Sequence, residues 1–123
     1  MFSDKEKNLN KIETLIGEKC KVLGSLNGEG LIKIDGFVEG DICWEDDIVL
    51  GLNSCCKSNI TCKNAFISGK VEGNVICENT LTLETYGKVS GDITVKNVII
   101  KEGASFDGKC TMIVSNNSNE LME

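Results

Sequence analysis

The chain has 123 residues, of which 41% are apolar, and a formal net charge of −6. This length is enough for one domain with a core, and the negative charge argues against general binding to nucleic-acid phosphates. No apolar run approaches the roughly 20 residues of a membrane-spanning helix and no signal peptide is visible, so we expect a cytoplasmic protein.

The first segment, MFSDKEKNLNKIET, is mostly charged and polar and lacks the apolar face of a capping helix. Phe2 is able to insert into a bilayer interface, and the nearby lysines attract anionic lipid, although neighbouring carboxylates oppose this. We expect residues 1–13 to be a disordered tail that either targets the membrane weakly and reversibly or has no partner. The candidate membrane-targeting residues are Met1, Phe2, Lys5 and Lys7.

Short repeats follow this tail. Three segments, GFVEGDI, GKVEGNV and GKVSGDI, share nearly the same seven residues, and further copies are recognised by a central small residue that recurs every 15 to 18 positions. Repeats of this length are too short for helix pairs or propeller blades and suit the coils of a β-solenoid. The six central residues are Gly24, Gly40, Ser58, Gly73, Gly91 and Gly108.

The positions beside these central residues alternate between apolar and polar. Such alternation predicts strands with one face inside and the other in water. Two residues before each centre lie Val22, Val38, Cys56, Val71, Val89 and Phe106. Two residues after it lie Leu26, Ile42, Ile60, Val75, Ile93 and Cys110. Further apolar runs, such as Ile48–Leu50 and Val98–Ile100, predict another wall of each coil. With neighbouring strands about 4.8 Å apart, six coils make a rod roughly 25–30 Å long.

The central glycines have two explanations that the sequence leaves open. Either a side chain there would point into a narrow interior, or the chain bends there and needs unusual dihedral angles. The columns do not give the handedness of the solenoid.

Catalytic and metal-binding chemistry is not favoured by the pattern. There is no His, and seven cysteines is an odd number for a closed disulfide framework. Cys56, Cys62, Cys77 and Cys110 fall in inward columns, where we expect small buried hydrophobic residues. The acidic run Glu45–Asp47 is typical of a solvated loop. We therefore expect no catalytic residue, no metal site and no cofactor.

The two ends of the predicted rod lack a capping element, because residues 114–123 also form a short polar tail that we expect to be disordered. Uncapped ends of equal width favour end-to-end stacking of copies. The Phe106 ring either covers the end of its own core or packs on the end of a neighbouring subunit. The residues assigned to a polymer interface are Phe106, Met112, Ile113 and Ile16.

From Thr14 to Met112 the sequence resembles the bactofilins, a family of polymer-forming bacterial cytoskeletal proteins. The resemblance depends on TLIGEKCKVLGSLNGEGLIKIDGFVEGDI, GKVEGNV, GKVSGDI and IKEGASFDGKC, in that order. It implies an all-β, single-domain, right-handed, three-sided β-helix of about six coils over residues 14–113, which assembles end to end without nucleotide. It also implies that Phe106 contributes to polymer contacts and that the opening Met-Phe-Ser belongs to a membrane-targeting segment.

The pattern departs from the family in the middle coil, where Leu52–Ile60 lacks the paired glycines, and in the absence of a Pro-rich tail. We predict a non-enzymatic cytoskeletal protein at the inner membrane face that binds itself and membrane lipid and serves wall-synthesis or motility proteins. No nucleic acid or nucleotide partner is expected. The alternative is a solenoid binding module that acts as an adaptor for a wall or motility partner.

Overall fold

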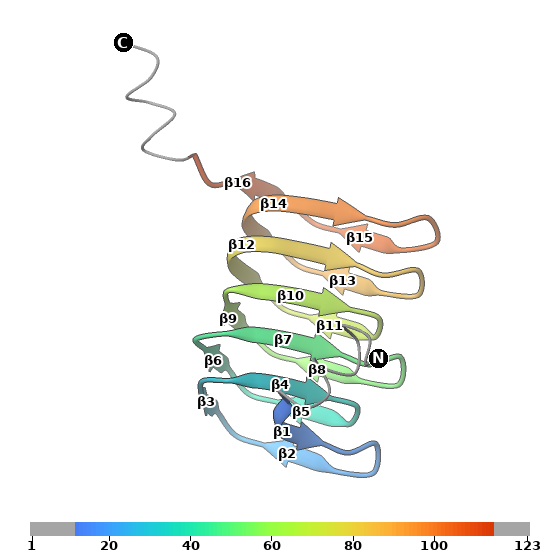
Figure 1. Ribbon diagram of the computed structural model, residues 1–123. Helices are drawn as coiled ribbons and strands as arrows, with labels where there is room; N and C mark the ends of the chain where they lie inside the picture. The colour runs from blue at the N-terminus through green and yellow to red at the C-terminus, as the bar shows by residue number, and fades with distance from the viewer. Residues whose placement is uncertain (1–11, 115–123) are drawn as a thin grey trace, which may run out of the picture.

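The computed structural model describes residues 12–114, which form sixteen β-strands joined by turns. The strands wind as successive coils along one axis, with the first coil at the blue end and the last at the orange-red end of Figure 1. Their bounds are β1 Ile12–Ile16, β2 Lys21–Leu23, β3 Leu26–Gly28, β4 Leu31–Ile34, β5 Phe37–Glu39, β6 Ile42–Trp44, β7 Asp47–Leu50, β8 Cys55–Lys57, β9 Ile60–Cys62, β10 Asn64–Ile67, β11 Lys70–Glu72, β12 Val75–Leu83, β13 Lys88–Ser90, β14 Ile93–Ile100, β15 Ser105–Asp107 and β16 Cys110–Met112. The prediction of an all-β solenoid of about six coils is confirmed.

Every coil contributes one strand to each of three faces, and every strand pair is parallel. Face A consists of β1, β4, β7, β10 and the second halves of β12 and β14. Face B is a six-stranded sheet of β2, β5, β8, β11, β13 and β15. Face C consists of β3, β6, β9, the first halves of β12 and β14, and β16. The long strands β12 and β14 turn the corner from face C to face A, so these two faces form one ten-stranded sheet.

In-register pairing places equivalent repeat positions next to each other along the axis. On face B, for example, Val38 pairs with Cys56, Cys56 with Val71, and Val71 with Val89, and all four side chains are buried. The apolar columns predicted from the alternation are therefore the core, except in the first and last coils, where their members are partly buried or exposed. Because each apolar side chain is stacked on its equivalent in the next coil, the core is a continuous column along the rod.

The backbone explains why a small residue recurs at the centre of each repeat. Gly40, between β5 and β6, has a φ of 138°, and a Cβ there would collide with the carbonyl oxygen of Gly24 in the preceding coil. The second reason that the sequence left open, an unusual dihedral angle at a bend, therefore applies. The space is also restricted, but by the backbone of the adjacent coil and not by the interior of the solenoid. Ser58, the exception, is buried, and its hydroxyl donates to the Val38 carbonyl oxygen at 3.5 Å.

Side-chain oxygens directly after these turns link one coil to the next. Asn59 accepts a hydrogen bond from the backbone N–H of Asn74 at 3.0 Å, Asn74 accepts from Asp92 at 3.0 Å, and Asp92 accepts from Lys109 at 3.2 Å. We call this set the Asx ladder. It fixes the register of four successive coils at one corner of the rod.

The cysteines follow the predicted columns with one correction. Cys56, Cys62 and Cys77 are buried as expected, but Cys110 is exposed because no further coil covers the last one. Burial raises the pKa of the Cys56 thiol to about 12. A hydrogen-bonding contact with Cys77, whose sulfur lies 3.7 Å away, raises the pKa of Cys62, and burial adds to the effect.

The acidic run is a loop only in part. Glu45 and Asp46 lie in the turn between β6 and β7, as predicted, whereas Asp47 begins β7. The Asp46 carboxylate accepts from the Gly30 N–H at 2.7 Å, and the Asp47 carboxylate accepts from the Asn64 amide at 3.0 Å. Both carboxylates are thus used to hold adjacent coils together.

Candidate polymer interface

The C-terminal end of the rod is formed by the second half of β14, by β15 and by β16. None of these segments has a strand on its outer side within residues 12–114, so their outer backbone groups are free to pair with another chain. The inward positions of this last coil are all apolar or thiol side chains, namely Val98, Ile100, Ala104, Phe106, Cys110 and Met112. An apolar floor with open strand edges around it is the kind of surface that another copy of the coil is able to cover.

The inward side chains of the last coil are much more exposed than their partners in the preceding coil. Ile100 is 49% exposed, whereas Leu83, its partner in the preceding coil, is 0% exposed. Met112 is 47% exposed over a fully buried Val95. Covering the exposed half of each of these side chains would contribute about 1 kcal/mol apiece, since full burial is worth about 1.5–3 kcal/mol.

Phe106 lies in β15, directly over Val89 of β13. Its ring packs against the core and is partly buried, so the structure places it on the end of its own core, the first of the two predicted positions. The outer side of the ring is not covered by any described residue. A contact between that side and a neighbouring subunit stays a prediction.

Ile113 and Met112 lie at the same end as Phe106, as the sequence predicted. The Ile113 N–H donates to the Val95 carbonyl oxygen at 2.7 Å, which continues the β16 pairing by one residue, and the side chain is exposed. Ile16 lies elsewhere. It is in β1, at the opposite end of the rod, and only 7% exposed beneath Ile34. Within one subunit the structure therefore does not bring Ile16 together with the other three residues.

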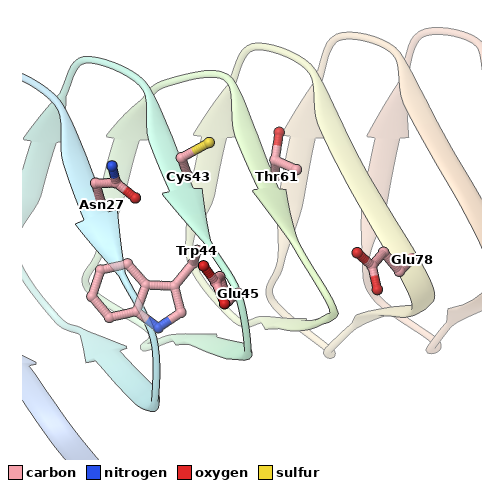
Figure 2. Close-up of a pocket in the computed structure, with 6 residues that line it drawn as sticks. All are labelled: Asn27, Cys43, Trp44, Glu45, Thr61 and Glu78. Atoms are coloured by element: carbon pink, nitrogen blue, oxygen red, sulfur yellow. The ribbon is translucent and has the colours of Figure 1, made fainter.

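The N-terminal end is formed by β1, β2 and β3, and its inward positions are less exposed. Trp44, from β6 in the second coil, extends its ring under Gly28 of β3, where a Cβ would lie 2.8 Å from the ring. Its indole N–H donates to the Gly30 carbonyl oxygen. The ring therefore fills the space in the first coil that Gly28 leaves open, and Figure 2 shows it directed toward β3.

A hollow of about 330 Å³ lies on face C, and Trp44 is one of its lining residues, which Figure 2 labels. The other lining residues are Asn27, Cys43, Glu45, Thr61 and Glu78. These polar groups come from successive coils and are spread along the face without converging on one point. The described residues include no group of three or more His, Cys, Asp or Glu side chains placed to bind a metal ion.

Charge does not oppose contact at either end. The last coil, residues 97–114, contains two lysines and two acidic residues, and so does the first, residues 12–28. In the last coil, Lys101 is paired with Glu84 of the preceding coil at 2.9 Å. Two such ends are able to approach each other without strong electrostatic repulsion, although the whole chain carries −6.

Sequence reasoning found three residues of the C-terminal surface but missed Ile100, Ala104 and Cys110 as members of it. The signal was present, because Ile100 occupies the last position of a column that contains Leu83 in the preceding coil. Only the count of coils tells which member of a column is left uncovered. The predicted membrane-targeting residues, Met1, Phe2, Lys5 and Lys7, lie outside the described residues. No helix in the part that the structure describes is long and apolar enough to cross a bilayer.

The parallel coils, the glycine turns and the open apolar end define a β-solenoid of the kind that another copy is able to extend. The family model of the bactofilins, described as polymer-forming and cytoskeletal, matches residues 14–111. The chain belongs to the bactofilin family.

Two curated relatives from Myxococcus xanthus (strain DK1622) support this assignment. The chain is 33% identical to bactofilin BacP over 103 residues, which is 84% of this chain and 43% of BacP. It is 30% identical to bactofilin BacO over 99 residues, which is 80% of this chain and 79% of BacO. The chain thus spans less than half the length of BacP and most of the length of BacO.

Among solved structures, the fold is similar to that in a cryo-EM reconstruction of Thermus thermophilus bactofilin double helical filaments. The TM-score is 0.76 at 22% sequence identity, and the match covers 81% of this chain and 99% of the other. At this identity the likeness establishes the shared fold.

Proposed function

We propose that this bactofilin polymerises end to end, through the floor of its last coil, into filaments that need no nucleotide. The observation that carries the proposal is the exposure of core-column residues at the C-terminal end, where Ile100 and Met112 are half exposed above fully buried neighbours. The open edges of β15 and β16 add backbone hydrogen bonds to the same contact.

The absence of a nucleotide requirement follows from the kind of contact. Apolar burial and strand pairing are available to the protein as folded, and they hold as soon as two ends meet. The family description as polymer-forming supports self-association as the central activity.

Two further parts of the proposal concern assembly and location. The Thermus thermophilus filaments are double helical, and we propose that single rows of subunits, or protofilaments, of this chain also associate in pairs. We further propose that the filaments lie at the inner membrane face through residues 1–11, the segment that precedes β1, and scaffold machinery for cell shape, wall synthesis or motility. A filament presents many such segments at once, so weak individual binding adds up to stable attachment.

Electron microscopy of the purified full chain without added nucleotide tests polymerisation. Filaments are the expected result, and a monodisperse monomer at high concentration would overturn it. Liposome sedimentation of the full chain, compared with a chain lacking residues 1–8, tests membrane attachment. If both chains pellet equally, the N-terminal segment is not the anchor.

A further inference from the structure

One outward column of face A is largely apolar along the whole rod. The strand register places its members side by side, coil after coil. In order from the first coil to the last they are Leu15, Lys33, Val49, Phe66, Thr82 and Ile99. We call this column, together with Leu31 beside it, the lateral stripe. Its apolar members face outward, and Leu15, Phe66 and Ile99 are exposed.

The other two faces do not share this character. The two outward columns of face B together carry a charged side chain in every coil, for example Lys57, Lys70 and Glu72. Their large apolar members, Leu23 and Phe37, lie in the first two coils only. The outward column of face C carries small or polar side chains, with Ile76 as its one large apolar member. Exposed apolar side chains that recur along one face only are more than the scattered ones of an ordinary surface.

Three of the charged groups on face A have partners within the chain. Lys33 pairs with Asp35 at 3.2 Å, and Lys101 pairs with Glu84 at 2.9 Å. The Asp47 carboxylate, beside Val49, accepts from the Asn64 amide at 3.0 Å. The lateral stripe itself contains one charged side chain, Lys33, and this is the lysine paired with Asp35. Two copies of the stripe are therefore able to meet without strong repulsion between like charges.

The centre of the stripe combines an exposed ring with a hollow. A groove of about 360 Å³ is lined by Leu31, Asp47, Val49, Phe66 and Glu84. An aromatic side chain beside a partly apolar groove on the same face is the self-complementary arrangement that a contact between two identical surfaces needs. Next to Phe66, Thr82 is only 6% exposed although it points outward, which shows that larger neighbours already cover the small side chains of this column.

We propose that the lateral stripe is the surface on which a second copy of the chain docks, so that two protofilaments pair along face A. The proposal rests on end-to-end polymerisation as proposed above. The stripe runs from the first coil to the last, so every stacked subunit contributes its full length to the side of the protofilament. Each lateral contact is then repeated at every subunit, and modest contacts add up along the length of the filament.

A bilayer is a less suitable occupant of this face. Attraction to anionic lipid needs free cations, whereas Lys33 and Lys101 are already paired with carboxylates and the groove also contains the carboxylate of Asp47. A groove is also better filled by a side chain than by a lipid surface. The chemistry therefore favours a protein surface of the same composition, and a second copy supplies it.

The test is Phe66→Lys in the full chain, with Ile76→Lys as the matched control. The two residues have similar exposure, 38% and 44%, and both point outward from strands of the middle coils, but Ile76 lies on face C. Electron microscopy of filaments gives the mass per length, and circular dichroism with thermal melting confirms that each variant is folded. Phe66→Ala serves as a second, milder variant that removes the ring without adding charge.

We expect Phe66→Lys to give single protofilaments that still form at the wild-type protein concentration, while Ile76→Lys keeps wild-type pairing and Phe66→Ala unpairs part of the population. Single protofilaments in the wild type, or paired ones in Phe66→Lys, would overturn the proposal and leave end-to-end polymerisation intact. Absence of all filaments in the wild type would instead reject the proposed function. If Phe66→Lys keeps paired filaments but no longer sediments with phosphatidylglycerol-containing vesicles, face A contacts membrane and the proposal is wrong.

Discussion

Replacement of Phe106 by Arg is the most direct perturbation of the proposed end-to-end contact. The ring lies over Val89 with its outer side open, so a neighbouring subunit would cover the remaining part. Losing that apolar burial costs about 0.5–1 kcal/mol, because only the smaller part of the side chain is left to be covered. Placing an unpaired guanidinium in the covered contact costs about 3–5 kcal/mol more, because no carboxylate among the inward positions of this coil is available to pair with it.

Together these effects weaken each contact that contains residue 106 by about 3.5–6 kcal/mol. At about 1.4 kcal/mol for each factor of ten, the concentration needed for assembly rises roughly three hundredfold or more. We therefore expect Phe106→Arg to form no filaments at concentrations at which the wild type polymerises. A subunit whose C-terminal end is blocked is left as a monomer if unlike ends meet, and as a dimer joined at its N-terminal ends if like ends meet.

Sedimentation and electron microscopy measure this effect, with Tyr86→Arg as the control. Tyr86 is an exposed aromatic residue in the turn between β12 and β13, away from the end of the rod. Circular dichroism must show that both variants keep the β-fold. Filaments of normal length from folded Phe106→Arg protein would refute the assignment of the contact to this surface.

Three further predictions concern the protomer itself. Gly91→Ala should lower the free energy of unfolding by about 1–3 kcal/mol in thermal melts, because Gly91 has a φ of 143° and an added Cβ would collide with the Gly73 carbonyl. Gly17→Ala is the control, because Gly17 has open space around it, and it should change stability little. In the Phe106→Arg variant, a thiol reagent should modify the exposed thiols quickly and the buried thiols only after unfolding. In wild-type filaments, Cys110 should become protected from the reagent. Equal labelling of Cys110 in the variant and in filaments would contradict coverage of this end. The thiols expected to react quickly are those of Cys20, Cys43 and Cys110. Burial raises the pKa of the Cys56 thiol from 9.0 in the unfolded chain to about 12 in the folded one. The contribution of this thiol to the free energy of unfolding is therefore complete below pH 9.0 and declines as the pH rises toward 12. Urea melts should show lower stability in that range, and Cys56→Val should remove part of the decline.

The core columns were predictable from sequence because alternation of apolar and polar residues reports which side of a strand is buried, whatever the strand pairs with. Val38 and Val71 illustrate this, since their burial follows from their neighbours in sequence alone. The same rule cannot tell that Cys110 is exposed. Its column is an inward one, but exposure depends on whether another coil lies above, and that is a property of the whole stack.

The lateral stripe was not predicted for a related reason. Val49 and Phe66 belong to the apolar runs Ile48–Leu50 and Ala65–Ile67, which as runs indicate a buried wall. The strand bounds and burial pattern show that the first and last residues of each run face the core, while the middle residue points to solvent. Two solvent-facing apolar residues from different coils can be recognised as parts of one surface only when the register between the coils is known.

The end of the Asx ladder distinguishes a boundary between subunits from a boundary between coils. Asn59, Asn74 and Asp92 each provide an oxygen that accepts an N–H from the next coil, but Lys109 occupies the same position in the last coil and has no acceptor. A subunit stacked on this end therefore gains apolar burial and strand pairing without the side-chain bond that fixes register inside the rod. We therefore expect the proposed contact between subunits to be weaker than the contact between coils, so that filaments dissociate on dilution under conditions in which each subunit stays folded.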